Sequence, residues 1–567
     1  MASTERVGAT AVPASPPAVP DGPPDRKPAR RFTRRPRLDR ERWPRLAGGF
    51  ASVAVAIALY TRTGINGLLS RDDSIYAYGG QQLAHGVPPY TSIFDPKGPL
   101  PTMLAALGAA VARLLGKNDL LVMRLEFLAG SVLTVLMIYL LVLQLWNSVL
   151  AGVVAAVVFA SFEGFAVGAL AGPEAHSPEV LFAVVSMWFA ARKQWYWAAF
   201  AGSLAFTVKQ TVGSFYPLIA IIGAVVWVTA RRWRAAGIAI AGALTPLAAL
   251  IVYFAAVGGL RKFVEAAFVF PVVGLRRAHP QTLRQRVTGV VETVNTHPLS
   301  AVLFWIGALL LVAFAVASVV RAGSLWRCAL REPLVLVVAA TFVCQAGYTL
   351  VDFMKFDPYL YPLLPYPAIG FGVASAFAVQ RLRRPQLVRT GLAVVAAGGI
   401  ALTAASWRLY GDSAANNDIL RDQRATACAI DRIVGPAEPL YAIGTPVPLV
   451  LTGRRNPDRF IYLDSGVAQW KIDRTADGFN GWVAQVLDTG APVIVIDGWD
   501  GARALVMQRA IVRAGYSNGF IGRWNVLLTT AALRSARDDG IAVTRLATAW
   551  PQTTRHTRFM TQRCGAG

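Results

Sequence analysis

The stretch that decides the fold of this chain runs from Arg71-Asp72-Asp73-Ser74-Ile75-Tyr76, through the turn Gly86-Val87-Pro88-Pro89-Tyr90, to Phe94-Asp95-Pro96-Lys97-Gly98-Pro99-Leu100. It places three carboxylates and a lysine in one segment, called here the acidic loop (residues 71–100). The loop follows an apolar segment at residues 46–63 that is long enough to enter a bilayer. Charged groups beside a membrane cost free energy unless they face water, a cation or a substrate. The acidic loop is therefore predicted to hold a functional site.

The composition predicts a membrane protein. Of the 567 residues, 54% are hydrophobic and only 16% are charged, and the mean hydropathy is +0.45. Soluble domains carry about 25% charged residues. The formal net charge is +24, but Arg and Lys cluster in the short connectors between apolar runs, as the positive-inside rule produces. No nucleic-acid-binding motif accompanies this charge, so we expect membrane lipid and no nucleic acid among the partners.

The basic connectors also predict how the helices are oriented. The groups at 192–193, 231–234, 321–331 and 381–389 are expected on the cytoplasmic side. They share that side only if the apolar segment Pro99–Leu115 does not span, so it is predicted to be an amphipathic or re-entrant helix at the outer surface. The predicted fold is an α-helical polytopic membrane protein with about eleven transmembrane helices and a cytoplasmic N-terminus. The expected spans are 46–63, 120–145, 149–166, 178–191, 195–209, 211–230, 235–256, 299–320, 333–351, 359–379 and 388–406.

The two ends of the chain differ from this helical part. Residues 1–45 are Pro/Ala-rich and then strongly basic, which predicts a disordered cytoplasmic tail before a transmembrane catalytic domain at 46–406. From about Tyr410 onward charges return, and β-rich runs alternate with helical stretches such as 502–514. Residues 407–567 are therefore predicted to form an extracytoplasmic α/β domain. Its expected strands are Leu440–Ile443, Phe460–Leu463 and Pro492–Asp497.

The cysteines leave one question open. Cys428 and Cys564 belong to the predicted extracytoplasmic domain, where a disulfide is permitted, and whether they form one is left open. Cys328 and Cys344 fall in or near a connector and a span and are interpreted as inert. No zinc-type Cys/His spacing occurs in the sequence.

The residues of the acidic loop suggest group transfer. Asp72 and Asp73 are adjacent, and two neighbouring carboxylates repel, so one of them holds a proton more tightly or shares a cation. A carboxylate of this kind can take the proton of an acceptor hydroxyl. Lys97 is a point charge suited to a phosphate oxygen. A base and a phosphate-binding lysine on one loop predict transfer of a group from a phosphate-linked donor.

The same residues resemble the first outer loop of GT-C glycosyltransferases, above all the family-39 protein mannosyltransferases and the bacterial aminoarabinose transferases of lipid A. An acidic pair, a Gly-x-Pro-Tyr turn and an acid-x-Lys-Pro-Pro element mark that loop, and the resemblance covers residues 46–380. The chain departs from it twice: the second acid is Asp73 rather than Glu, and Gly98 replaces the first proline after Lys97. A glycine there predicts a looser local backbone.

The resemblance implies a role for particular residues. Asp72, with Asp73 beside it, matches the base or acceptor-positioning carboxylate, and Lys97 matches a contact to the donor phosphate. The second loop (residues 172–179) supplies the further acids; Glu174 is preferred for proximity to Asp72, with His176 and Glu179 behind it. The remaining donor-phosphate candidates are Lys209, Lys355 and Tyr359. A divalent cation, with Asp95 and Glu174 as its tentative ligands, stays an open question.

The implied function is transfer of a sugar from a polyprenyl-phosphate donor to a hydroxyl of a glycan, lipid or protein acceptor, with inversion, at the outer face of a bacterial plasma membrane. No G-x-G-x-x-G or Walker motif is present, which agrees with a lipid donor and no nucleotide cofactor. Other interpretations stay open. Asp72 and Asp73 could cap a helix, the lysines could snorkel, and Tyr359 could belong to an aromatic belt. The chain as a whole could be a flippase or transporter of a lipid-linked glycan, or a non-catalytic scaffold.

Overall fold

The computed structural model describes residues 38–210, 216, 222–223, 232–275, 282–324, 333–351, 357–413, 419–499 and 501–545. The chain forms two compact units, Met1–Pro44 and Arg45–Gly567. Of the predicted disordered tail (1–45), the first 37 residues lie outside the described ones. Its last residues are helical, because α1 begins at Leu38 and ends at Thr61. Leu, Arg and Glu, which fill the start of α1, are good helix formers.

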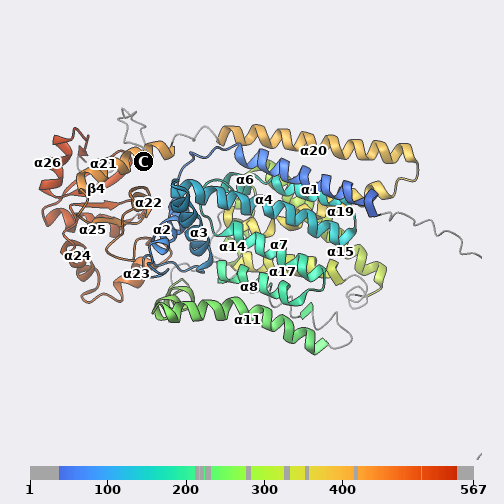
Figure 1. Ribbon diagram of the computed structural model, residues 1–567, viewed down its shortest axis with the longest axis horizontal. Coiled ribbons are helices and arrows are strands. Elements are labelled where there is room, and N and C mark those ends of the chain that lie inside the picture. The colour runs from blue at the N-terminus through green and yellow to red at the C-terminus, as the bar shows by residue number, and fades with distance from the viewer. Residues whose placement is uncertain are drawn as a thin grey trace, which may run out of the picture. The chain divides into compact units, whose positions relative to one another are not determined.

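Six described helical segments are long and apolar enough to cross a membrane. They are Arg42–Thr61, Asp119–Trp146, Arg232–Ala256, Pro298–Ala322, Pro358–Gln380 and Pro385–Gly411 (Figure 1). The corresponding helices are α1, α4 (Asp119–Trp146), α11 (Arg232–Ala256), α15 (Pro298–Ala322), α18 and α19 (Asp357–Leu360 and Pro365–Gln380) and α20 (Pro385–Ser413). Apart from the two helices of the acidic loop and its end, the other described helices of this part are α5 (Val149–Ala160), α6 (Glu163–Gly168), α7 (His176–Ala191), α8 (Trp195–Val208), α12 (Leu260–Val264), η1 (Glu265–Val269), η2 (Pro271–Leu275), α14 (Leu283–Val294), α17 (Pro333–Val351) and η3 (Tyr361–Leu363).

The predicted number of spans is not settled by these helices. Helices α5, α7 and α8 have 12, 16 and 14 residues. At about 1.5 Å per residue they are shorter than a hydrocarbon core of about 30 Å. The predicted span at 211–230 lies almost wholly outside the described residues. The count of eleven therefore stays a prediction.

One predicted span is broken in the structure. Residues 149–166 were expected to form one helix, but α5 ends at Ala160 and α6 begins at Glu163. The Glu163 backbone N–H donates to Ser300 Oγ at 2.9 Å, and its carboxylate lies 3.3 Å from His297 Nδ1. These polar contacts to α15 and the residue before it replace the helical bonds that a continuous span would have made.

The acidic loop contains a helix and leads into a second one. Helix α2 (Arg71–Ala84) packs against α3 (Leu100–Leu115), and α3 packs against α4. Helix α3 occupies the segment predicted not to span. It buries alanines on one side, while Leu107 and Leu114 are exposed. This two-sided pattern fits the expected amphipathic helix; its place at the outer surface stays a prediction.

A five-stranded sheet forms the centre of the C-terminal part, in the order β1-β2-β4-β3-β5. Strands β1 (Leu440–Ile443) and β2 (Val493–Ile496) are parallel, and the other neighbouring pairs are antiparallel. Both strands and α25 (Ala502–Arg513) were predicted from the sequence. The remaining elements are α21 (Ile419–Val434), α22 (Val447–Thr452), α23 (Val467–Ile472), α24 (Gly478–Asp488), β3 (Ser517–Ile521), β4 (Trp524–Leu528), α26 (Thr530–Asp538) and β5 (Thr544–Arg545).

The predicted strand Phe460–Leu463 is wrong. This segment is not part of the sheet. Instead, Ile461 O accepts from Gly444 N at 2.7 Å, just past β1, and Arg459 O accepts from Phe94 N of the acidic loop at 2.7 Å. The segment therefore lies outside the sheet and links it to the acidic loop through these two backbone hydrogen bonds.

Further contacts fasten the C-terminal part to the acidic loop. The Gln423 side chain of α21 bonds both the N–H and the C=O of Leu69, each at 3.0 Å. Tyr78 OH accepts from Asn456 N at 2.9 Å, and helix α2 lies beside α22 (Figure 1). One cluster of buried apolar side chains also continues from α2 into the sheet. The acidic loop is thus held by residues more than 300 positions away in the sequence.

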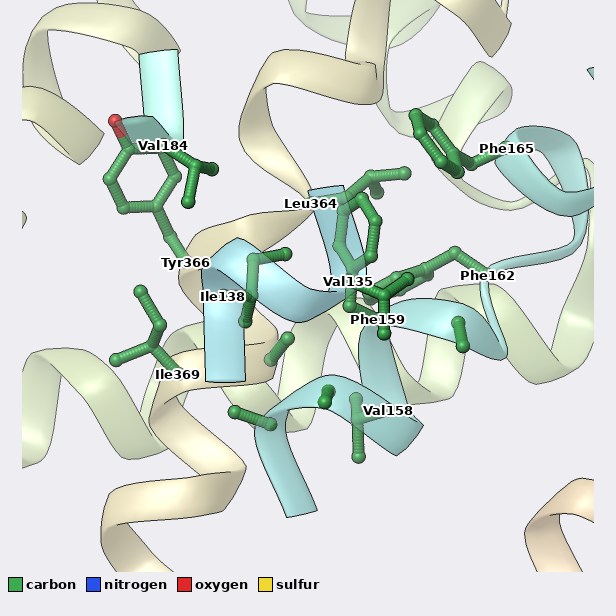
Figure 2. Close-up of a cluster of buried hydrophobic side chains, with 14 of the residues drawn as sticks. Val135, Ile138, Val158, Phe159, Phe162, Phe165, Val184, Leu364, Tyr366 and Ile369 are labelled. Atoms are coloured by element: carbon green, nitrogen blue, oxygen red, sulfur yellow. The ribbon is translucent and has the colours of Figure 1, made fainter. Parts of the chain in front are cut away.

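The helical part has an apolar core of its own. Figure 2 shows side chains of α4, α5, α7 and α19 meeting around Phe159, with Phe162 and Phe165 beside it. The core members drawn are apolar apart from the phenol of Tyr366. This core holds the helices that carry the second loop.

Candidate active site

The two adjacent acids stand in different surroundings. Ser70 caps α2: its Oγ accepts from Asp73 N at 3.0 Å and donates to Asp73 Oδ2 at 2.7 Å. Asp73 is buried, whereas Asp72 is exposed. Asp73 therefore fits the alternative in which the acids stabilise the start of a helix, because a carboxylate in the first turn interacts favourably with the helix dipole. Asp72 is left with a side chain open to solvent.

Asp73 and Glu174 form a buried acidic pair. Burial raises the pKa of Asp73 to about 6, with Ser70 opposing and Asp72 adding to the shift. Burial also raises the pKa of Glu174 to about 7, and the charge of Asp73 contributes next. The second loop packs closely here, since a Cβ on Gly172 would lie 3.0 Å from Asp73 Cβ. Glu174, expected near Asp72, therefore has Asp73 as its acidic neighbour.

Lys97 is held in place through its backbone. Its N–H donates to Asp95 Oδ1 at 3.0 Å, and its C=O accepts from Tyr90 OH at 2.8 Å. Its Nζ lies 5.3 Å from the ring centroid of Tyr76. Burial by itself lowers the pKa of Lys97, but the oxygens of Tyr76 and Tyr359 and then Asp72 and Asp95 raise it well above its usual value. Lys97 thus stays a cation.

The backbone of Gly98, next to Lys97, packs directly against the end of α8. The prediction that this glycine makes the local backbone looser is therefore wrong. Gly98 N donates to Val208 O at 3.1 Å, and a Cβ on Gly98 would lie 1.8 Å from Thr207 O. Proline has no N–H to donate, and any side chain would collide with the Thr207 carbonyl. Glycine therefore brings the acidic loop directly against the segment that ends in Lys209.

Lys209 and Tyr359 meet beside the second loop. Lys209 Nζ lies 3.6 Å from the ring centroid of Tyr359, the geometry of a cation–π contact. The His176 ring lies 4.8 Å from Tyr359, and His176 Nδ1 lies 3.0 Å from Glu179 Oε2. Burial, followed by Lys209 and Lys97, lowers the pKa of His176, so the imidazole is neutral. Within the second loop, Glu179 thus pairs with His176, whereas Glu174 is influenced by Asp73.

The structure brings together most of the predicted site residues. Lys209 contacts Tyr359, and Lys97, which lies 112 positions earlier in the chain, is within electrostatic range of the same ring. Lys355 lies outside the described residues. The members joined by direct contacts or by electrostatic range are Asp72, Asp73, Asp95, Lys97, Glu174, His176, Glu179, Lys209 and Tyr359.

The expected ligands of a divalent cation do not assemble into a metal site. Asp95 accepts from the Lys97 N–H, while Glu174 accepts from the N–H groups of His176 and Ser177, both at 3.2 Å. Among the residues that the structure describes, no group of three or more His, Cys, Asp or Glu side chains is arranged to hold a metal ion. The carboxylates of Asp95 and Glu174 therefore do not fit a metal ion.

Sequence reasoning missed the contribution of the C-terminal part to this site. Burial raises the pKa of Tyr462, Asp72 adds to the shift and Lys97 opposes it, so the phenol lies within electrostatic range of both. Asp464 forms an ion pair with Arg71, the residue before Asp72. The available signal was the Tyr-x-Asp spacing after Phe460–Ile461, which was interpreted as a strand.

A buried arginine was also missed. The Arg124 side chain of α4 is 1% exposed and donates to Gly67 O at 3.0 Å and to the carbonyl of Ile65. It fixes the chain just before α2 begins, which makes it a positioning residue for Asp72. A lone arginine in an apolar segment is a signal that could have been used.

The structure describes two of the four cysteines, Cys344 and Cys428. Cys344 is free and Cys428 is disulfide-bonded. Cys328 and Cys564 lie outside the described residues, so the pairing of Cys428 with Cys564 stays a prediction.

Two solved structures have a similar fold. The crystal structure of ArnT from Cupriavidus metallidurans bound to undecaprenyl phosphate matches with a TM-score of 0.58 and 13% identity, over 84% of this chain and 97% of that one. The apo structure of the same protein gives 0.57 and 14%, over 86% and 99%. The predicted GT-C-like fold of a multi-pass membrane protein is thereby confirmed. No family model and no curated protein matches the chain.

Proposed function

We propose that this chain is a membrane glycosyltransferase that moves a sugar from a polyprenyl-phosphate donor to an acceptor hydroxyl. The observation that carries the proposal is that Lys209 Nζ lies 3.6 Å from the ring of Tyr359, while Lys97, packed near Tyr76, is within electrostatic range of that same ring and of the exposed Asp72. Fixed cations stabilise a departing phosphate, and a carboxylate can take the proton of the acceptor hydroxyl. The structure of similar fold that was solved with undecaprenyl phosphate supports a lipid-linked donor.

The reaction is a single displacement. The acceptor oxygen attacks the anomeric carbon, the bond from that carbon to the phosphate oxygen breaks, and Asp72 takes the hydroxyl proton. The departing polyprenyl phosphate keeps the electron pair of the broken bond, and Lys97 and Lys209 stabilise its charge. Because one displacement occurs, the configuration at the anomeric carbon inverts. Lys355 is proposed as a further phosphate contact.

Asp73 and Glu174 support this machinery without taking part in the displacement. Both carboxyls are buried with raised pKa values of about 6 and about 7. With a pKa of about 7, Glu174 is protonated in about half of the molecules at neutral pH, which reduces the negative charge next to the donor phosphate.

The arrangement in the cell follows from the basic connectors. We place the N-terminus in the cytoplasm and the site with residues 407–567 on the outer face of a bacterial plasma membrane. The transmembrane catalytic domain is then residues 46–406, with α20 continuing to Ser413. The acceptor is a glycan, lipid or protein exposed on that face.

The proposal is tested with purified full-length protein in lipid nanodiscs. Radiolabelled undecaprenyl-phosphate pentoses and hexoses are supplied beside the matching nucleotide sugars, together with a membrane and cell-wall extract as acceptor. We expect one lipid-linked donor to be consumed, with release of undecaprenyl phosphate and label in the extract. Consumption of nucleotide sugars alone, or movement of intact lipid-linked sugar across vesicles without transfer, would contradict the proposal.

A further inference from the structure

An open pocket lies in the C-terminal part, next to the acidic loop. Its volume is about 420 Å³, within the range of about 300–1,000 Å³ of small-molecule sites. Asp464 lines one part of it, while Trp499 and the start of α25, with Ala502 and Arg503, line another. None of the roles proposed above uses this pocket.

The pocket is connected to Asp72 through Arg71. The Arg71 guanidinium pairs with the pocket residue Asp464 and lies 5.1 Å from the ring centroid of Tyr462. Gly498, just before Trp499, makes room for it: a Cβ there would lie 2.8 Å from Arg71 Cδ. The residue adjacent to the proposed base therefore contacts a residue of the pocket's wall.

Electrostatic range gives a second connection. Burial raises the pKa of Asp464, Arg71 opposes the shift, and the charge of Asp72 adds to it. Tyr462, two residues earlier, is likewise influenced by Asp72 and by Lys97. The pocket residue Asp464 is thus within electrostatic range of Asp72, and the neighbouring Tyr462 is within range of both Asp72 and Lys97.

The lining has the chemistry of a carbohydrate site. Arg503 donates to Gln469 Oε1 at 2.6 Å, so a guanidinium and an amide are fixed next to the Asp464 carboxylate. Such donors and acceptors suit the vicinal hydroxyls of a sugar ring. Trp499 packs at 5.4 Å on the buried Trp482, which keeps the indole rigid.

We propose that this pocket binds the acceptor, and that the acceptor is a glycan whose hydroxyl is presented to Asp72. The inference deepens the proposed function and rests on it. It gives the C-terminal part a share in the active site: the helical part with the acidic loop binds the donor, and the sheet part selects the acceptor.

The test fills the pocket without touching the donor residues. Ala502→Trp places an indole at an exposed lining position, and Arg503→Gln removes one donor group. Arg509→Gln, exposed on the same helix and not among the lining residues, is the matched control. Binding of octyl pentofuranosides and octyl hexopyranosides to the full chain in nanodiscs is measured by saturation-transfer NMR, and Ser/Thr peptides serve as the comparison.

Transfer to the same probes gives the second measurement. We expect wild type to bind a glycoside, and each pocket variant to raise the Kd and the acceptor KM about tenfold, a loss of about 1.4 kcal/mol. The donor Kd and the Arg509→Gln control stay unchanged. Glycoside binding unaffected by Ala502→Trp, or binding of peptides alone, would overturn the inference. Because binding is measured without turnover, pocket-dependent binding by an inactive protein contradicts the proposed function instead.

Discussion

The apolar core of the helical part and the polar layer around the acidic loop are built differently. In the core, backbones touch: a Cβ on Gly372 of α19 would lie 2.4 Å from Ala151 O of α5. In the polar layer, backbones also touch at Gly98, but the contact there places Lys97 beside the segment ending in Lys209. Small residues serve helix packing in the first region and the position of charges in the second. The same substitution should therefore lower stability in the apolar core and lower activity in the polar layer.

The largest of these effects is expected for the lysines. Lys97→Met and Lys209→Met should each weaken binding of the lipid-phosphate donor about 10- to 100-fold, since a hydrogen bond to a charged group contributes about 1.5–3 kcal/mol. Donor Kd is measured by competition with undecaprenyl phosphate in nanodiscs. Lys117→Met, at an exposed lysine after α3, should leave the Kd unchanged. Equal affinity in all four proteins would show that the cations do not bind the donor.

A glycine pair tests the comparison directly. Gly98→Ala should lower the turnover of the folded fraction about tenfold, because the added Cβ collides with the Thr207 backbone and the acidic loop must move away from it together with Lys97. Gly372→Ala should lower the melting temperature by several degrees, through overpacking of about 1–3 kcal/mol, while the folded fraction keeps its turnover. Gly67→Ala, where a Cβ meets nothing within 4 Å, is the control for both. If both substitutions left the turnover of the folded fraction unchanged, the contact at Gly98 would serve packing alone, as the contact at Gly372 does.

The smallest effect concerns pH. Glu174 binds its proton more tightly in the folded state, with a pKa of about 7 against a usual 4.5. Its contribution to stability is therefore fully present below about pH 4.5 and is lost as the pH rises through about 7, by at most about 3 kcal/mol. Glu174→Gln should flatten the fall in melting temperature between pH 5 and pH 8 relative to wild type. Asp488→Asn, far along the chain in α24, provides a comparison that should keep the wild-type slope.

Local sequence patterns selected the candidate residues of the site, whereas the expectation that they meet came only from the resemblance. Asp72 and Lys97 could be selected because charged residues in a mostly apolar chain are conspicuous. The contact of Gly98 with Val208 could not be predicted, since the two residues are 110 positions apart and a glycine by itself indicates only conformational freedom of the backbone. Nor could the place of Tyr462, because a β-rich run looks the same in a sheet and in an extended connection.

The fold shows the same division. Strands β1 and β2 are continuous apolar runs and were predicted, whereas the β3–β4 hairpin contains glycine, asparagine and serine and was missed. The long apolar helices α4 and α15 were predicted to within a few residues. The break after Ala160 was not, because it depends on Ser300 and His297, which come from another part of the chain.

The most direct measurement is single-turnover transfer by Asp72→Asn beside Asp422→Asn, an exposed first-turn acid of α21 that serves as the matched control. If Asp72 takes the acceptor proton, the rate of transfer from the lipid-linked donor falls about 10²- to 10⁴-fold in Asp72→Asn, without weaker donor binding. The Asp422→Asn rate stays at the wild-type value. Transfer by Asp72→Asn at a near-wild-type rate would contradict the role given to the acidic loop.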